Sequence, residues 1–498
     1  MTQIDETART AWARRSVRSR LKVIRRFRGL LAEKADWIAK DIAEASVSRP
    51  VGLPGVAEVL TSEVLPLCDA AKFLEREAGY WLKPQRLGWR GRPAWLFGVS
   101  SEIRREPLGT VLIIAAGNYP LFLPGVQALQ ALTAGNAVVL KPGRGGTAAA
   151  TWLADVLRDA GLPAGLLTIT GETVEDATEA MDAGVDKVFL TGSVHSGRAV
   201  LAKCAETLTP ACVELSGCDA VFVLSGSEDA TIQLAAKAVA FGLRLNGSQT
   251  CIAPRRVLVT PEFKDPFVEA LREQVEAGGA VAWDQRVVER VWPSVEAAVE
   301  GGATIVCGAK PMESIRGLPV VVDGVIANMD LPQTDVFGPI VSVIEAPNSD
   351  AMREADAACP YALGAAVFGP RNEAERFART LQVGSVTVND LIVPTADPRL
   401  PFGGRGDSGF GVTRGAEGLL AMTRVKTVSV RKLHQHPHYD PTGEGDAEAF
   451  TAYVRVAHGP SVASRLVNVP ALVRGLKAMS KKTGANQGTE HDREQHES

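Results

Sequence analysis

The segment Thr110-Val-Leu-Ile-Ile-Ala115 is a short apolar run that suits a buried strand. A helix-compatible stretch over 121–134 follows it, and then a second apolar run, Ala137-Val-Val-Leu-Lys141. Leu166-Leu-Thr-Ile-Thr170 and Lys187-Val-Phe-Leu-Thr191 continue the series. Because continuous apolar runs that alternate with helices are typical of a parallel sheet covered on both faces, we predict a doubly wound α/β domain.

Ligands of such sheets bind beyond the carboxyl ends of the strands. Thr191-Gly-Ser193 follows a strand and precedes a helix predicted over 197–208, so its backbone N–H groups can face a pyrophosphate with the helix dipole behind them. An ordinary helix cap would have the same sequence. The alternation of strands and helices predicts a dinucleotide-binding domain. Whether Thr191-Gly-Ser193 binds a pyrophosphate or only caps the helix stays open.

A second α/β unit is predicted from three further strand-like runs, Arg255-Arg-Val-Leu-Val259, Ile340-Val-Ser-Val-Ile344 and Ser385-Val-Thr-Val-Asn389. Just before it, a helix-compatible stretch runs into small polar residues and ends at Cys251. Gly247-Ser248 lets the backbone turn tightly there. A thiolate is the strongest carbonyl nucleophile of a protein near neutral pH, but a lone cysteine can equally be an inert, buried small hydrophobe.

Composition narrows the class of protein. A chain of 498 residues with 46% hydrophobic and 22% charged content is globular and long enough for two or three domains. A net charge of −3 gives no reason to expect nucleic acid as a partner. Seven cysteines without close C-x-x-C pairs favour a reducing, cytoplasmic location, and no signal peptide or long apolar run is visible. His434, His436 and His438 lack acidic or cysteine partners, so no metal site is predicted.

Five short motifs accompany Cys251, and their order is highly specific although each is short. Together they resemble the aldehyde dehydrogenase superfamily from about Thr10 to Lys432, nearest its compact branch for fatty and aromatic aldehydes. The motifs are Gly117-Asn-Tyr-Pro120, Val188-Phe-Leu-Thr-Gly-Ser193, Glu214-Leu-Ser-Gly217, Asp335-Val-Phe-Gly-Pro339 and Pro401-Phe-Gly-Gly404.

The resemblance implies a reaction and its residues. Cys251 would attack an aldehyde, Asn118 would stabilise the oxyanion, and hydride transfer to NAD or NADP would leave a thioester. Glu214 would activate the water that releases a carboxylic acid, and would need a pKa raised by burial. The expected substrate is an apolar aliphatic or aromatic aldehyde. Two alternatives are a dehydrogenase that passes the thioester to coenzyme A, which Glu214 argues against, and a catalytically idle scaffold or binding protein.

The resemblance also implies a cofactor site that departs from the family pattern. Lys141 and Asp335 would hold the two riboses, and Gly192 with Ser193 the pyrophosphate. Arg144 stands where the family carries glutamate, so NADP could be accepted or preferred, although a solvated loop arginine is an equal reading. Asp335 is one methylene shorter than the family's glutamate. Gly117 replaces a common tryptophan, and could alter packing near the pyrophosphate.

The expected domain limits follow from these motifs. A cofactor-binding domain is predicted over 1–216, with 92–107 contributing a β hairpin for oligomerisation. A catalytic domain is predicted over 217–415, and a return with a subunit-bridging strand over 416–432. The remainder, 433–498, is predicted as a basic amphipathic extension with a disordered end.

The resemblance implies a homodimer or homotetramer. From Ala449 to Thr489 the extension has no acidic residue and interleaves basic with apolar side chains. Such a segment can lie on an anionic membrane or pack against the protein's own dimer, and the sequence favours neither. Pro470 is expected to interrupt any single helix in it.

Overall fold

The computed structural model describes residues 4–45, 55–311, 316–433, 436–439, 441–443 and 446–478. They form two compact units, one within residues 1–84 and 104–426 and the other within 85–103 and 427–498. None of the described helices combines the length and the apolar character that crossing a bilayer requires. The division into a cofactor domain and a catalytic domain stays a prediction, because both sheets described next belong to the larger unit.

The first sheet of the larger unit has six strands in the order β19-β7-β6-β3-β4-β5. Its neighbours are parallel except for β19, which pairs antiparallel with β7. The order of the parallel strands reverses between β3 and β6, which marks the switch point of a doubly wound sheet. The predicted fold class is confirmed. The strands are β3 (Thr110–Ile114), β4 (Ala137–Lys141), β5 (Leu167–Ile169), β6 (Lys187–Gly192), β7 (Ala211–Leu215) and β19 (Gly409–Phe410).

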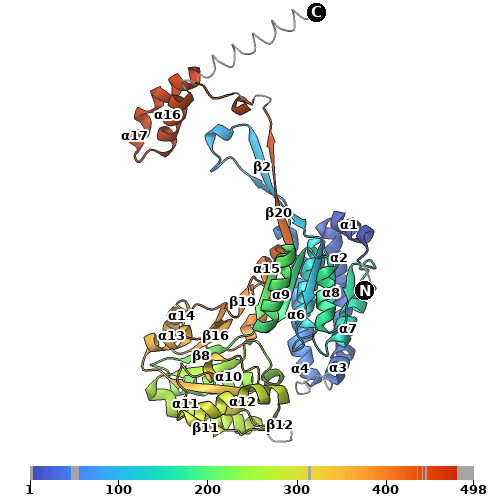
Figure 1. Cartoon of the computed structure of the whole chain (residues 1–498), viewed down its shortest axis with the longest axis vertical. Helices are drawn as coiled ribbons and strands as arrows, with labels where there is room; N and C mark the ends of the chain where they lie inside the picture. Colours follow the sequence, from blue (N-terminus) through green and yellow to red (C-terminus); the bar gives the residue numbers. More distant parts are fainter. Residues whose placement is uncertain are drawn as a thin grey trace, which may run out of the picture. The chain divides into compact units, whose positions relative to one another are not determined.

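Alternate residues of β3 enter different hydrophobic cores. Val111 and Ile113 pack in one core and Leu112 and Ile114 in the other, as a side-chain period of two requires. Helices therefore cover both faces of this sheet (Figure 1). One face carries α6 (Phe122–Ala134) and α7 (Thr147–Asp159), and the other α8 (Val174–Asp182) and α9 (Val194–Thr207).

Local signals fix where these helices begin and end. Thr173 and Asp176 form a capping box at the start of α8. Gly135, with φ 104°, ends α6 in the left-handed conformation that glycine adopts without steric cost. The predicted start of α9 was wrong by three residues, because Ser193 caps the helix and its hydroxyl accepts a hydrogen bond from the Ser196 N–H at 3.2 Å. The turn is thus directly joined to a helix N-terminus.

The second sheet of the larger unit has seven strands in the order β11-β13-β14-β9-β8-β16-β17, and β11 alone pairs antiparallel with its neighbour. The strands predicted over 255–259, 340–344 and 385–389 are confirmed to within a residue. The strands are β8 (Asp219–Val223), β9 (Pro254–Val259), β11 (Thr304–Cys307), β13 (Val320–Asp323), β14 (Ile340–Glu345), β16 (Gly364–Phe368) and β17 (Ser385–Val388).

Helices cover both faces of this sheet as well. One face carries α10 (Asp229–Arg244) and α11 (Pro261–Gly278), and the other α12 (Gln285–Glu300), α13 (Ser349–Ala357) and α14 (Arg371–Ala378). Short elements join them: η4 (Leu245–Ser248), β10 (Val281–Ala282), β12 (Arg316–Gly317), η5 (Leu331–Gln333), β15 (Tyr361–Ala362), η6 (Val393–Ala396), β18 (Arg405–Gly406) and α15 (Gly415–Ala421).

The turn between β18 and β19 ties the two sheets together. Its sequence, Gly404-Arg-Gly-Asp-Ser-Gly409, by itself leads to the expectation of a flexible loop, but Ser408 is fully buried. Its hydroxyl donates to the Ser216 carbonyl at 2.9 Å and accepts from the Ala362 N–H at 3.0 Å. The expectation was wrong because the small, polar sequence builds a satisfied buried turn rather than a solvated one.

The amino-terminal helices pack against the first sheet. Leu21, Ile24, Phe27 and Leu31 stand at helical spacing in the sequence and lie on the apolar face of α2, which joins the core shared with α6 and α7. The elements are α1 (Glu6–Arg14), α2 (Val17–Glu33), α3 (Ala35–Ala45), α4 (Val56–Val59), the π-helical turn η2 (Leu60–Val64) and α5 (Leu65–Trp81).

A three-stranded sheet is formed by β1 (Gln85–Leu87), β2 (Val99–Pro107) and β20 (Thr423–Arg431), in that order, and most of its residues belong to the smaller unit. The extended chain predicted from Trp95 begins only at Val99, because Ala94–Leu96 form the 3₁₀ turn η3. Further along lie η7 (Pro437–Tyr439), α16 (Asp446–His458), α17 (Val462–Val467) and a helix over 469–478.

The interruption predicted at Pro470 is present, because α17 ends at Val467 and a new helix begins at 469. Pro470 stands in the first turn of this helix, where its missing N–H is not needed. His434 and the segment from Asn486 onward, where disorder was predicted, lie outside the described residues.

Candidate active site

A cavity of about 1160 Å³ opens at the switch point of the six-stranded sheet. The loop after β3 contributes Asn118, the end of β6 contributes Gly192 and Ser193, and β7 contributes Glu214. Cys251 lines the same cavity from the segment that joins η4 to β9. Residues far apart in the chain thus meet where a doubly wound sheet is expected to bind its ligand.

The backbone before Cys251 forms a strained turn. Asn246, Gly247 and Ser248 have φ values of 50°, 58° and 63°. Asparagine and glycine enter this left-handed region readily, whereas other residues do so at a cost of about 1–2 kcal/mol. The tight turn predicted at Gly247-Ser248 is therefore present, and it begins one residue earlier.

A buried guanidinium holds this turn in place. Arg255 is 1% exposed, and its Nη1 donates to the Ser248 hydroxyl at 2.7 Å and to the Gly338 carbonyl at 2.6 Å. Its Nη2 donates to the carbonyls of Ser248 at 2.6 Å and Thr250 at 3.3 Å. Because one side chain binds both the turn before Cys251 and the loop after Asp335, it fixes two walls of the cavity at once.

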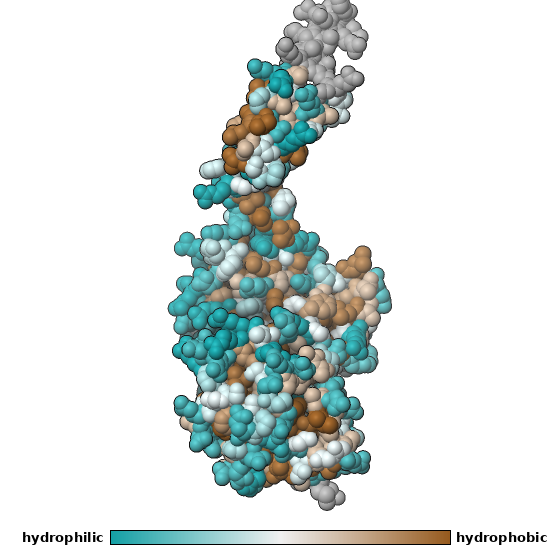
Figure 2. Space-filling model, turned by 90° about the vertical axis from the view of Figure 1, so that its left-hand side faces the viewer, coloured by the Kyte–Doolittle hydropathy of each residue, from teal (hydrophilic) through white to brown (hydrophobic). Residues whose placement is uncertain are grey.

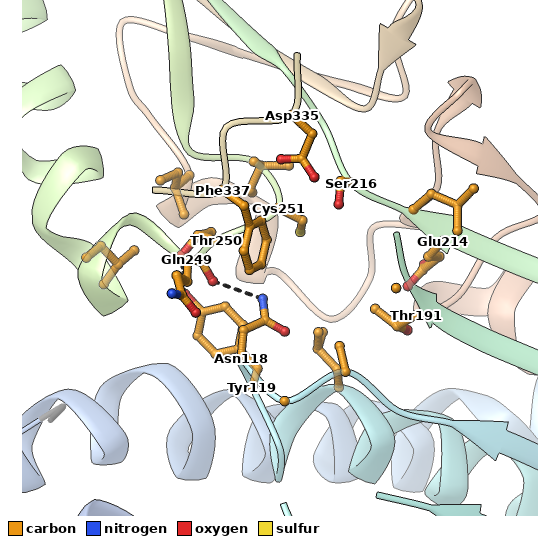
Figure 3. Close-up of a pocket in the computed structure, with 18 of the residues that line it drawn as sticks. Asn118, Tyr119, Thr191, Glu214, Ser216, Gln249, Thr250, Cys251, Asp335 and Phe337 are labelled. Atoms are coloured by element: carbon orange, nitrogen blue, oxygen red, sulfur yellow. Dashed lines mark hydrogen bonds between the residues drawn. The ribbon is translucent and has the colours of Figure 1, made fainter. Parts of the chain in front are cut away.

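The loop after β3 is bonded to the same turn. The Asn118 side-chain nitrogen donates to the Gln249 carbonyl at 3.0 Å, and the hydroxyls of Tyr119 and Thr250 lie 2.6 Å apart (Figure 3). An amide nitrogen carries two hydrogens, so the second donor of Asn118 is not used by this bond. In Figure 3 the Cys251 side chain lies between Asp335 and Asn118.

The Cys251 thiol is protonated at neutral pH. Burial raises its pKa to about 12, the charges of Asp219 and Glu214 act in the same direction, and the Arg414 guanidinium opposes them. Because only the thiolate is a strong nucleophile, the thiol needs a base that accepts its proton during attack.

Glu214 has the properties of such a base. It is 4% exposed, and burial raises its pKa to about 7, while the hydrogen bond from Thr413 and the charge of Arg414 oppose the rise. The Thr413 hydroxyl donates to Glu214 Oε1. A carboxylate with a pKa near the working pH can both accept and return a proton.

Asp335 offers a buried acceptor at the cavity wall. No described residue donates a hydrogen bond to its Oδ1, although this atom is buried. Burial raises the pKa of Asp335, and Ser216, Arg255 and Arg290 oppose the rise. Arg290 Nη1 also donates to the Asp335 carbonyl at 2.7 Å, which fixes the backbone of this loop.

The loop after β3 and the loop after β4 lie at the carboxyl edge of the six-stranded sheet. They approach each other so closely that only glycine fits between them. A Cβ on Gly117 would lie 2.6 Å from the Arg144 carbonyl oxygen, and one on Gly143 would lie 2.3 Å from the Gly117 nitrogen. The Gly145 N–H donates to Glu172 at 2.8 Å and fixes the second loop from behind. The absence of a side chain at 117 is thus a packing requirement of this chain, and it leaves Arg144 at the cavity wall.

A family model described as the aldehyde dehydrogenase family matches residues 2–428. The chain belongs to this family. It is an NAD(P)-dependent oxidoreductase that converts aldehydes to carboxylic acids.

Relatives of this dehydrogenase carry several substrate names. The succinate-semialdehyde dehydrogenase [NADP(+)] 1 of Mycobacterium ulcerans is 32% identical over 80% of this chain and 90% of its own length. A probable coniferyl aldehyde dehydrogenase of Pseudomonas aeruginosa is 29% identical over 77% and 81%. The solved structure of an indole-3-acetaldehyde dehydrogenase from P. syringae, in complex with NAD+ and IAA, is 26% identical, with a TM-score of 0.77 and coverage of 86% and 88%.

The structure brings most of the predicted site residues of this family member to one cavity. The residues that line it are Asn118, Arg144, Gly192, Ser193, Glu214, Cys251 and Asp335. Lys141 does not line it and lies half-buried at the end of β4, where burial lowers its pKa and the charges of Glu172 and Asp176 oppose that shift.

Three residues that surround the reacting groups of this dehydrogenase were missed from the sequence. Thr413 and Arg414 follow a glycine-rich turn that carried no recognisable motif. Arg255 was treated as part of an ordinary strand, although two arginines opening the otherwise apolar strand β9 were a usable signal. A buried strand tolerates arginine only where the guanidinium finds several acceptors.

Proposed function

We propose that this dehydrogenase oxidises its aldehyde on Cys251, with Glu214 as the general base and Asn118 as the oxyanion donor. The observation that supports this most directly is the single cavity that holds a thiol with a pKa of about 12 beside a carboxyl group with a pKa of about 7. The expected apolar body of the substrate fits the walls formed by Phe122, Phe241 and Phe402.

In the proposed reaction Cys251 Sγ attacks the aldehyde carbon while its proton passes to Glu214. The carbonyl oxygen becomes an oxyanion, and the free N–H of the Asn118 amide stabilises it together with the Cys251 backbone N–H. NAD(P), when bound, accepts the hydride that leaves the aldehyde carbon. Glu214 releases the thiol proton to solvent and then deprotonates a water molecule that attacks the acyl group on Cys251. The C–S bond breaks, the carboxylic acid leaves, and the Cys251 thiolate takes the proton back from Glu214.

The residues at the switch point fit a dinucleotide. The unpartnered Oδ1 of Asp335 can accept from a ribose hydroxyl, and the Ser193 cap presents the N-terminus of α9 to a pyrophosphate. The glycine pair at 117 and 143 lets the loop after β3 and the loop after β4 pack against each other beside this site. Arg144 is exposed at the cavity and makes no ion pair with a described residue, so we infer that NADP is accepted as well as NAD.

The test follows cofactor reduction with short, long and aromatic aldehydes, with NAD or NADP, and with or without coenzyme A. Cys251→Ala should abolish turnover, whereas Cys204→Ala, which removes a buried thiol outside the cavity, should keep it. A requirement for coenzyme A would favour the acylating reaction instead. No turnover under any condition would favour the idle scaffold.

We also propose that the smaller unit mediates assembly into a homodimer or homotetramer. Its described residues expose many large apolar side chains, and Figure 2 shows hydrophobic surface over the C-terminal helices. Exposed apolar patches of this kind mark interaction sites. They include Leu87, Trp89, Trp95, Phe97, Val430, Phe450, Val454, Leu466, Val473 and Leu476.

The mass in solution of the full chain and of a chain ending at Lys432 tests this assembly. A smaller oligomer after truncation would support packing of the extension against a second copy. Sedimentation of the full chain with anionic vesicles, lost on truncation, would support the membrane alternative. A cytoplasmic location is proposed with either outcome of the mass measurement.

A further inference from the structure

Arg414 is a buried cation that lacks an anionic partner. It is 7% exposed, and its Nη1 donates to the Thr395 carbonyl at 2.8 Å. Within the described part of the chain, nothing accepts a hydrogen bond from its buried Nε, and no carboxylate lies within ion-pair distance. Burial lowers its pKa, and a buried charge is costly unless it is paired. The charges of Glu214 and Cys251 oppose this lowering, but neither residue forms an ion pair with Arg414.

The backbone holds this side chain in place against strain. Arg414 has φ 58° and ψ 173°, a region that is essentially restricted to glycine and costs about 1–3 kcal/mol for other residues. The preceding residue, Thr413, is fixed by two backbone hydrogen bonds of 2.8 Å with Phe402, and the Arg414 carbonyl accepts from the Gly418 N–H at 2.8 Å. Strain of this kind collects at active sites and ligand clamps.

The guanidinium lies at the wall of the reaction cavity. Its central carbon is 4.2 Å from the centre of the Phe402 ring and 5.8 Å from that of Phe122, and all three residues line the cavity with Cys251. Its charge lowers the pKa of both Cys251 and Glu214, so it acts on the reacting groups directly. Much of the neighbouring lining is apolar, including Leu123, Ile392 and Val393.

Glu214 cannot be the permanent counter-ion of this arginine. Its carboxylate already accepts from Thr413, and it forms no ion pair with Arg414. In the proposed reaction it must also take up a proton, and it would then lose the charge that pairing needs. The missing anion has to come from outside the chain.

We propose that Arg414 binds a carboxylate carried by the substrate, so that the preferred substrates combine a short apolar chain with an acidic group a few bonds from the carbonyl, in place of the wholly apolar aldehyde expected above. A planar guanidinium binds a carboxylate with two parallel hydrogen bonds, and the unsatisfied Nε supplies one donor of that fork. This inference rests on the proposed function, since it names the substrate class for the same cavity.

Matched substrates test it in the active enzyme. The substrates are 4-oxobutanoate and its methyl ester, which has nearly the same shape without the charge, compared as the ratio of their kcat/KM values. The ratio should favour the acid in the wild type and fall about 10- to 100-fold in Arg414→Met, with partial retention in Arg414→Lys. Any effect of the lost cation on Glu214 or Cys251 changes kcat/KM for both substrates by the same factor, so it cancels in the ratio.

Arg286→Met is the matched control, because Arg286 lines the same cavity but already pairs with Asp284 at 2.9 Å. This change should leave the acid-to-ester ratio as it is in the wild type. An ester used as well as the acid by the wild type, or a ratio that Arg414→Met leaves unchanged, would overturn the proposal.

A second measurement needs no cofactor and no turnover. Iodoacetate and iodoacetamide alkylate thiols with the same chemistry but differ in charge, and peptide mass spectrometry reports the rate at Cys251. Arg414→Met should slow iodoacetate about tenfold more than iodoacetamide. If the proposed function is wrong, no aldehyde is oxidised, but Arg414→Met still slows alkylation by iodoacetate more than alkylation by iodoacetamide. Failure of the present inference would appear as oxidation of neutral aldehydes with no charge effect in either experiment.

Discussion

The hydroxyl of Thr413 donates a hydrogen bond to the carboxylate of Glu214, although 199 positions separate the two residues. The contact forms because Gly409, at the start of β19, pairs with Glu214 of β7 and brings the following segment over the carboxylate. A donor aimed at a carboxylate stabilises its charged form. The pKa of Glu214 is therefore a balance between burial, which raises it, and Thr413 with Arg414, which lower it.

The rate of acid release should depend on this balance. The base works only when it is deprotonated, so turnover should fall as the pH drops through about 7. Thr413→Val keeps the shape of the side chain and removes its hydrogen-bond donor, which raises the pKa of Glu214. The fall in turnover at low pH should then begin at higher pH, and turnover below that point should be about tenfold slower. A pH–rate profile of kcat checks the shift. An unmoved limb would mean that another group controls it.

Glu214→Gln should separate activity from stability. Because Glu214 both accepts the proton of the Cys251 thiol and activates the hydrolytic water, acylation and hydrolysis should both slow, and turnover should fall by about 10²- to 10⁴-fold without a burst of NAD(P)H. Because the folded pKa is raised from 4.5 to about 7, the native carboxyl group loses stability as the pH rises through that window. The glutamine variant should therefore be more stable above pH 7, by roughly 2–3 kcal/mol. Stopped-flow absorbance and urea unfolding at pH 5 and pH 8 measure the two effects.

Asn118→Ala should lose transition-state stabilisation. Removing one donor to an oxyanion costs about 3–4 kcal/mol of barrier, so kcat/KM should fall about 10²- to 10³-fold. The Asn118 carbonyl, which accepts from Asn246 at 3.0 Å, is retained by the change. Cofactor binding, followed by intrinsic fluorescence, should persist. A fall in cofactor affinity of the same size would instead indicate collapse of the loop after β3.

Arg255→Met should damage both fold and catalysis. The change leaves the buried carbonyls of Ser248, Thr250 and Gly338 without their donor, at a cost of about 1–3 kcal/mol each before relaxation. Displacement of Cys251 by about 1 Å can lower the rate roughly 100-fold. Arg371→Met is the control, because its ion pair with Glu375 is exposed and its loss should leave stability nearly unchanged. Urea unfolding and kcat are measured for both.

Arg144→Glu should shift the cofactor preference from NADP towards NAD. A carboxylate there repels a 2′-phosphate and can accept from a 2′-hydroxyl. The kcat/KM with NADP should fall at least tenfold relative to NAD, and binding of NADP should weaken in parallel. An unchanged ratio would make Arg144 a solvated loop residue.

The sequence predicted both sheets because their strands are short apolar runs separated by amphipathic helices, and such runs depend on local composition. It also predicted that Cys251, Glu214, Asn118 and Asp335 would meet, on the order of the motifs. It missed Thr413, Arg414 and Arg255, because their roles depend on which strands pair, and pairing is not encoded by any local pattern. Ser408 was misjudged for the same reason, since small polar residues suit a solvated loop and a satisfied buried turn equally well.

The close approach of Gly117 to the Arg144 carbonyl has an evolutionary consequence. Since a side chain at 117 would start inside the space of the neighbouring loop, neither segment can be exchanged with a relative by itself. A chimaera that takes the tryptophan common at this position must import the partner loop over 142–146 from the same donor. The two segments should therefore be exchanged together, with the arginine at 144 as part of the exchanged unit.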